Sequence, residues 1–104
     1  MRRLLPALLG LLVASVAQAG DARFELGRQV FREQAQPACS LCHSLRAADA
    51  SGEIGPDLDQ LKPDAARVAA AVRGGVGVMP SFAVTLSAEQ IEAVAEYVAR
   101  VAGN

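Results

Sequence analysis

Apolar residues recur at helical spacing just after the hydrophobic N-terminal stretch of this chain. Phe24, Gly27 and Phe31 are three, four and seven positions apart, which places them on one face of an α-helix. Asp21 precedes them, and an aspartate can cap the free N–H groups of a first helical turn. We therefore predict a first helix over residues 22–35 with Asp21 as its N-cap.

A second helix is predicted over residues 64–73. Its body consists mainly of alanine and valine, and alanine has the highest intrinsic helix propensity. Pro63 suits the start of a helix, and Gly74 with Gly75 favours its end.

The last helix is predicted to begin with a capping box formed by Ser87 and Gln90. Apolar residues then occupy one arc of its surface, and Tyr97 is expected on the flank of this arc. The residues of the arc are Ile91, Val94, Ala95, Val98, Val101 and Ala102.

Residues 44–60 are polar and contain the turn-forming pairs Ser51-Gly52 and Gly55-Pro56, so they are predicted to be mostly loop. The alternation typical of strands is absent, and no segment repeats. The pattern predicts a single all-α domain with three to four helices.

The N-terminus has the three parts of a secretory signal. Arg2 and Arg3 supply the positive charge, residues 4–16 supply an apolar stretch, and Ala17-Gln18-Ala19 resembles a cleavage site. The apolar stretch is short for a membrane span, which needs about 20 residues; an uncleaved anchor is the alternative.

We therefore expect a leader over residues 1–19, cleaved after Ala19, and one exported domain over residues 20–104 in the periplasm, without a membrane span.

The mature chain has eight basic and eleven acidic residues, a formal charge of minus three. It has no basic stripe, so nucleic acid is not an expected partner. It also lacks tryptophan and has few aromatics, and a flat apolar cofactor would supply the bulk that its small core lacks.

Cys39-Ser40-Leu41-Cys42-His43 is the strongest chemical signal, because C-x-x-C-H is typical of c-type haem attachment. On a helix, Cys39 and Cys42 point to the same side, where both thiols can bond the two vinyl groups on one porphyrin edge. His43 can then reach the iron. We predict one haem c, covalent through Cys39 and Cys42, with His43 as an iron ligand.

Other interpretations of this motif explain less. A disulfide between the two cysteines would close a four-residue loop and stabilise little. Structural zinc usually takes four Cys or His ligands, and only three are present. A thioredoxin-like redox site needs a βαβ setting, which this chain does not predict.

Met79 is the candidate ligand for the opposite face of the iron. It is the only methionine after the predicted leader, and it lies between a glycine-rich segment and Pro80. Histidine with methionine is the axial pair found in cytochromes c. Alternatively, Met79 is an ordinary core methionine, and Lys62 or solvent is the sixth ligand of the iron.

Other residues are also expected to contribute to a haem site. A ligating histidine usually donates its second ring N–H to an acceptor, and Pro56 can offer a rigid carbonyl, although Gly-Pro is also an ordinary turn pair. Leu58 is expected to contact the porphyrin. Partners for the haem propionates are Arg46, Arg67 and Arg73, unless these are solvated surface charges.

The chain resembles the class I cytochromes c over its whole mature segment. The resemblance implies that the Pro56 carbonyl accepts the hydrogen bond of the proximal histidine, that Met79 is the distal ligand and that the terminal helices cross near Gly27. The matching motifs are Gly27 with Phe31, Cys39 to His43, Gly55-Pro56-Asp57-Leu58, Gly77-Val78-Met79-Pro80-Ser81-Phe82, and a terminal helix with Tyr97. More narrowly, residues 52–62 and the loop toward Met79 are similar to small bacterial periplasmic cytochromes, including the cytochrome subunit of sulfite dehydrogenases.

These features predict a periplasmic electron carrier and not an enzyme, because iron ligated on both faces has no open position for a substrate. The expected partners are redox proteins: a donor dehydrogenase and an acceptor oxidase or cytochrome. One alternative is a haem subunit bound tightly to one dehydrogenase, such as sulfite dehydrogenase. Another is a gas sensor or peroxidase in which Met79 is displaced.

Overall fold

The computed structural model describes the backbone of residues 5–104, and the side chains of residue 16 and residues 18–104. In this part of the chain the protein is mostly helical, with one small antiparallel pair of strands. The elements are α1 (Leu5–Gln29), the π-helix η1 (Val30–Gln34), α2 (Cys39–Cys42), β1 (Ser44–Leu45), the 3₁₀-helix η2 (Arg46–Ala48), β2 (Ala50–Ser51), α3 (Leu58–Leu61), α4 (Ala65–Gly74) and α5 (Ala88–Val101).

The first helix starts earlier than predicted. α1 runs through Asp21 without interruption, so the prediction that Asp21 caps its N-terminus is wrong for the full chain. The alanine-rich sequence before Asp21 explains the continuation, because only Gly20 weakens the helix there. At the other end, η1 stops before Pro37, and Ala35 is already extended.

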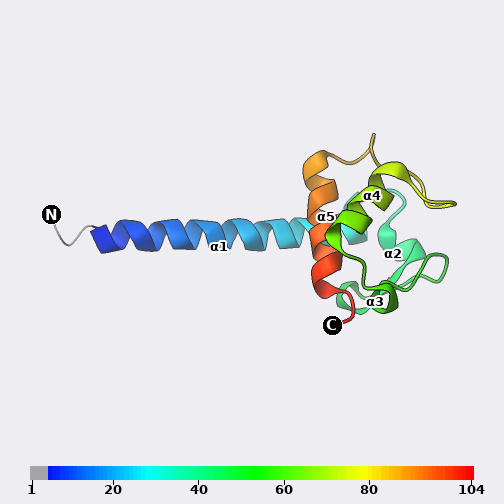
Figure 1. Ribbon diagram of the computed structural model, residues 1–104, viewed down its shortest axis with the longest axis horizontal. Helices are drawn as coiled ribbons and strands as arrows, with labels where there is room; N and C mark the ends of the chain where they lie inside the picture. Colours follow the sequence, from blue (N-terminus) through cyan, green and yellow to red (C-terminus); the bar gives the residue numbers. More distant parts are fainter. Residues whose placement is uncertain (1–4) are drawn as a thin grey trace.

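α1 projects from the rest of the molecule as a single rod (Figure 1). The described side chains from Gln18 to Arg23 are all exposed. The Arg2-Arg3 pair of the predicted leader lies outside the described residues. No helix among the described residues combines the length and the apolar character needed to cross a membrane.

α5 is the central element and is buried on two sides, between α1 and the rest of the domain (Figure 1). Ala93 and Tyr97 face α1, whereas Val94 and Val98 face a cavity on the other side. Tyr97, predicted on the flank of the apolar arc, is 1% exposed because α1 covers this flank. A single apolar arc describes a helix covered on one face, and α5 is covered on two.

Gly27 allows α1 and α5 to cross in close contact, as predicted. A Cβ atom at Gly27 would lie 2.6 Å from Tyr97 Cβ, which is too close for any side chain. The rings of Phe24 and Phe31 lie beside Tyr97, with centroids 5.2 and 6.2 Å away. Arg23 adds ion pairs to Glu92 and Glu96 at the exposed margin.

Both later helices start close to the predicted positions. α4 begins at Ala65, one residue after the predicted start, and the Asp64 side chain caps it by accepting the Arg67 N–H, a role that was not predicted. Ser87 with Gln90 forms the complete capping box of α5, as predicted. Both caps join residues three positions apart, so they operate wherever the helices lie in the fold.

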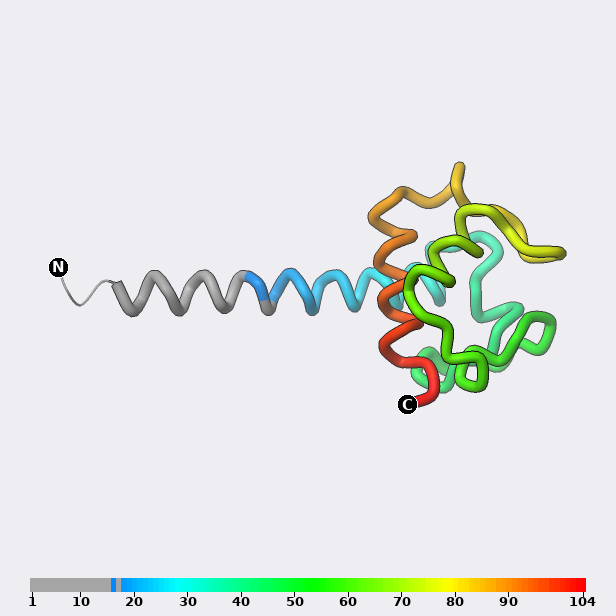
Figure 2. The backbone as a smooth tube through the Cα atoms, viewed as in Figure 1, coloured from blue at the N-terminus to red at the C-terminus, as the bar shows by residue number. Residues whose placement is uncertain are grey.

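Residues 44–60 contain more structure than the predicted loop. β1 and β2 pair through Ser44 with Ser51 and Leu45 with Ala50, and α3 follows. The buried Asp59 carboxylate connects three segments, because it accepts the N–H groups of Arg46 at 2.9 Å and Gly103 at 2.8 Å. The C-terminus therefore returns beside α3, as the tube in Figure 2 shows.

Candidate haem site

One cavity of about 420 Å³ brings together all six residues that the sequence predicted for the site. Its walls come from α2, the loop before α3, α4, the Met79 segment and α5, and they are mostly apolar. The predicted residues that line it are Cys39, Cys42, His43, Pro56, Leu58 and Met79.

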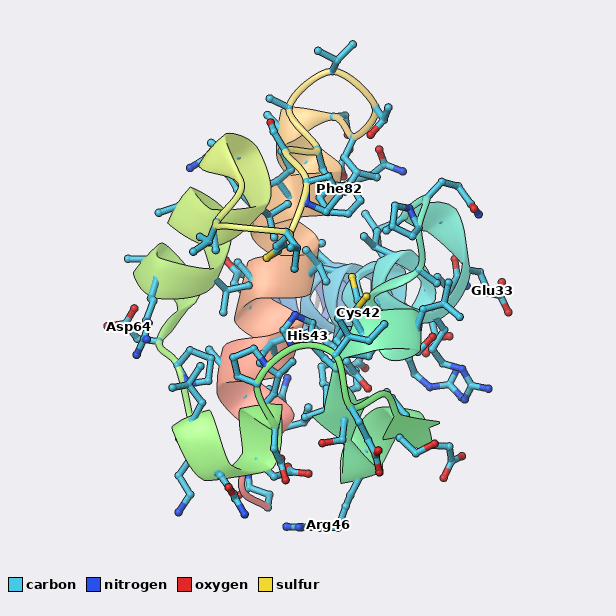
Figure 3. The ribbon with its side chains drawn as sticks, turned by 90° about the vertical axis from the view of Figure 1, so that its right-hand side faces the viewer. Glu33, Cys42, His43, Arg46, Asp64 and Phe82 are labelled. Carbon is cyan, nitrogen blue, oxygen red and sulfur yellow. The ribbon has the colours of Figure 1, made fainter. Side chains whose placement is uncertain are left out.

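α2 contains the two cysteines and ends directly before His43. Cys39 and Cys42 are its first and last residues, and His43 is its C-cap with extended backbone angles of φ −112° and ψ 143°. The His43 N–H still donates to Cys39 O at 2.9 Å. Figure 3 shows Cys42 and His43 next to each other in the centre of this face of the molecule.

The His43 ring is held by a backbone acceptor. His43 Nδ1 lies 2.8 Å from Pro56 O, so Nδ1 carries the proton and donates it to this carbonyl. Nε2 is then the unprotonated nitrogen, the form in which imidazole binds a metal. The carbonyl also fixes the orientation of the ring and increases its basicity toward the metal.

Gly55 contributes to the same arrangement, and the sequence analysis did not anticipate this role. Its N–H donates to Cys42 O at 2.6 Å, and a Cβ atom on Gly55 would lie 2.6 Å from His43 Cε1. Only glycine leaves room for the imidazole at this position. The sequence shows this glycine only as part of the Gly55-Pro56 pair, which also fits an ordinary turn.

Met79 lies on a tight turn at the edge of the cavity. Val76 and Met79 exchange two backbone hydrogen bonds of 3.0 and 2.9 Å, and Gly77 between them has a φ of +56°. Lys62, the alternative ligand, does not line the cavity. Its side chain instead packs against Gly103, where a Cβ atom would lie 3.0 Å from Lys62 Cγ. Of the two side chains predicted as candidates for the sixth ligand, Met79 lines the cavity and Lys62 does not.

Charge is scarce around the cavity. Burial raises the pKa of the Cys39 thiol to about 11, so this thiol is protonated at neutral pH and a poor nucleophile in the folded chain. Arg67 is the one formally charged residue among the described residues that line the cavity. Of the three arginines suggested for the propionates, Arg67 borders the site, and Arg46 and Arg73 do not.

These properties fit a haem. The cavity is large and apolar, as a porphyrin requires, and it presents two thiols, an oriented imidazole and a thioether. Cys39 and Cys42 would hold the porphyrin through thioether bonds, and His43 and Met79 would hold its iron.

Several exposed apolar side chains also line this cavity. Ile54, Val76 and Val78 do so and are 72%, 63% and 89% exposed. We call these three residues the apolar rim.

Comparisons with known proteins agree with the site. A family model described as cytochrome c oxidase, cbb3-type, subunit III matches residues 22–98. The crystal structure of the c-type cytochrome SorU from Sinorhizobium meliloti is similar over 80% of this chain and 94% of that chain, with 53% sequence identity and a TM-score of 0.77. A comparison with curated proteins gave no match.

The matched region contains all residues that line the cavity, the C-x-x-C-H motif and the parts of α1 and α5 that cross each other. The chain therefore belongs to the cytochrome c family, as a small all-α class I cytochrome c that carries electrons on covalently attached haem c.

Proposed function

We propose that this protein is a periplasmic single-electron carrier with one haem c, bonded through Cys39 and Cys42 and ligated by His43 and Met79. The observation that carries the proposal is the convergence of these four side chains on one cavity. The sequence contains no other cysteine or histidine, so it has no residues for a second site of the same kind.

The bound haem supplies an iron centre that gains and loses a single electron. His43 is oriented for this centre by its hydrogen bond to Pro56 O. Met79 offers a neutral, soft thioether, a type of ligand that raises the reduction potential. With His43 and Met79 both holding the iron, no ligand position would remain for a substrate, and the role of the protein would be electron transfer rather than catalysis.

The apolar rim supports brief contacts with redox partners. Weak redox encounters typically bury under about 1,200 Å², and the uncharged side chains of the rim let partners meet there without desolvating charges. We propose a dehydrogenase as donor and an oxidase or another cytochrome as acceptor.

Export is part of the proposal and rests on the sequence of residues 1–19. Sequencing the N-terminus of haem-loaded protein from the periplasmic fraction tests it. We expect the mature chain to begin at Gly20. A chain that retains the leader in the membrane fraction would contradict this part of the proposal.

Substitution of Met79 tests the ligation. We expect Met79→Ala to lower the reduction potential by on the order of 100 mV, since axial ligands set haem potentials over about 0.8 V. The reduced variant should bind carbon monoxide readily, whereas the wild type should bind it poorly. Val84→Ala, on an exposed residue that does not line the cavity, is the control. An unchanged potential in Met79→Ala, or ready binding of carbon monoxide by the wild type, would favour a sensor or peroxidase instead.

A further inference from the structure

The end of α4 is bound by the segment that follows Met79. The last carbonyl groups of a helix have no partner within the helix. Here Val72 O accepts the N–H of Phe82 at 2.8 Å, and Arg73 O accepts the hydroxyl of Ser81. Two of the free carbonyls of α4 are therefore satisfied by residues two and three positions after Met79.

The same segment approaches α4 closely at Gly75. A Cβ atom on Gly75 would lie 2.9 Å from Met79 O and 3.0 Å from Ser81 N, and Gly75 has a φ of +73°. The chain thus leaves α4 at Gly75, turns through Gly77 and comes back past Gly75 at Met79 and Ser81. The position of the Met79 backbone depends on the contacts between residues 79–82 and the end of α4.

Ser81 makes the one side-chain hydrogen bond between this segment and α4 among the described residues. Its Oγ donates to Arg73 O and also accepts the Ala83 N–H at 3.3 Å. Phe82 beside it is 5% exposed and belongs to the core. Ser81 itself is exposed, so its hydroxyl can be removed without leaving a hole in the core.

We propose that Ser81 is a positioning residue whose hydroxyl latches the Met79 segment onto the C-terminal end of α4. The latch keeps the thioether of Met79 at the iron and slows its release. This inference rests on the proposed ligation by Met79. It concerns the lifetime of the bond between Met79 and the iron, and not the identity of the ligand.

The test uses the ferric, haem-loaded protein and imidazole, which can bind the iron only after Met79 has left. The rate of imidazole binding is measured by stopped flow for the wild type, Ser81→Ala and Ser81→Thr. We expect Ser81→Ala to bind about two- to tenfold faster, the range set by losing one ordinary hydrogen bond. Ser81→Thr keeps the hydroxyl and should bind at the wild-type rate.

Thr85→Ala is the matched control, because Thr85 is an exposed hydroxyl residue in the same loop whose side chain makes no hydrogen bond with the described residues. It should also bind at the wild-type rate. A wild-type rate in Ser81→Ala, or equal acceleration in Ser81→Ala and Ser81→Thr, would overturn the latch. If the ferric wild type lacks the long-wavelength sulfur-to-iron band, the ligation itself fails, and this outcome is distinct from a failed latch.

Discussion

At the scale of single residues, two glycines matter because they have no Cβ atom. Gly55 leaves the space that the His43 ring occupies, and Gly27 leaves the space in which Tyr97 packs. Both glycines are visible in the sequence. The crossing at Gly27 was expected from the family resemblance, whereas the contact between Gly55 and the His43 ring is apparent only in the fold.

Asp59 is the buried carboxylate that joins the middle of the chain to its end. The backbone N–H of Gly103, and then that of Arg46, hold the pKa of Asp59 below its ordinary value. A group with a depressed folded-state pKa stabilises the fold above its unfolded pKa of about 3.9 and loses that contribution as the pH falls through the folded value.

We therefore expect Asp59→Asn to lower the free energy of unfolding at pH 7 by about 1.5–3 kcal/mol, because the amide can accept from only one of the two N–H groups. The difference from wild type should shrink as the pH falls below about 4. Denaturant unfolding of the haem-loaded protein at several pH values measures both effects.

Asp49→Asn is the control for this experiment. The Asp49 side chain is 89% exposed and has a weak contact with Arg32 at 3.9 Å, so its replacement should change stability by less than about 0.5 kcal/mol. Equal stability of Asp59→Asn and wild type at pH 7 would contradict the role of Asp59.

At the scale of elements, the sequence predicted best what short-range contacts decide. The capping of α5 by Ser87 and Gln90, for example, involves neighbours three positions apart. The start of α1 was predicted wrongly, because a capping residue does not end a helix that can continue upstream.

The site was more predictable than the turns around it. The C-x-x-C-H motif and Met79 were evident because haem chemistry restricts which residues can occupy them. The small strands and α3 within residues 44–60 were not, because they are only two to four residues long. Such pieces are stabilised by partners elsewhere, for example Asp59 with Gly103.

The crossing of α1 and α5 gives a prediction at this scale. We expect Gly27→Ala to lower the free energy of unfolding by about 1–3 kcal/mol, the usual cost of overpacking, since its Cβ would lie 2.6 Å from Tyr97 Cβ. Thermal unfolding of the haem-loaded protein measures the change.

Gly74→Ala serves as the matched control, because a Cβ atom there meets nothing within 4 Å. It should leave stability unchanged or raise it by up to about 1 kcal/mol through higher helix propensity. If Gly27→Ala were as stable as Gly74→Ala, the close crossing of the two helices would be refuted.

At the scale of the whole molecule, the elements of the fold converge on the haem cavity, whose exposed lining includes the apolar rim. These elements position the residues that line this cavity. α5 forms part of its wall, α4 leads into the Met79 segment, and α2 carries the two cysteines of the attachment motif.

The rim makes electron exchange sensitive to new charge at Val78. We expect Val78→Asp to slow electron self-exchange between two copies of the protein by about tenfold or more, because like charges facing each other across a contact cost several kcal/mol. The reduction potential should change little. Line broadening in NMR spectra of partly oxidised samples measures the rate.

Val84→Asp introduces the same charge at a residue that is 98% exposed and does not line the cavity. Its self-exchange rate should stay near that of the wild type. Equal slowing by both variants would mean that net charge, and not the rim, controls the encounter.

The proposed function depends on an iron held between the imidazole of His43 and the thioether of Met79. X-ray absorption at the iron edge of the haem-loaded protein measures these neighbours. We expect a single sulfur neighbour at bonding distance, with nitrogen in every other position, and the sulfur should disappear in Met79→Ala. An iron with no sulfur neighbour in the wild type would rule out ligation by Met79.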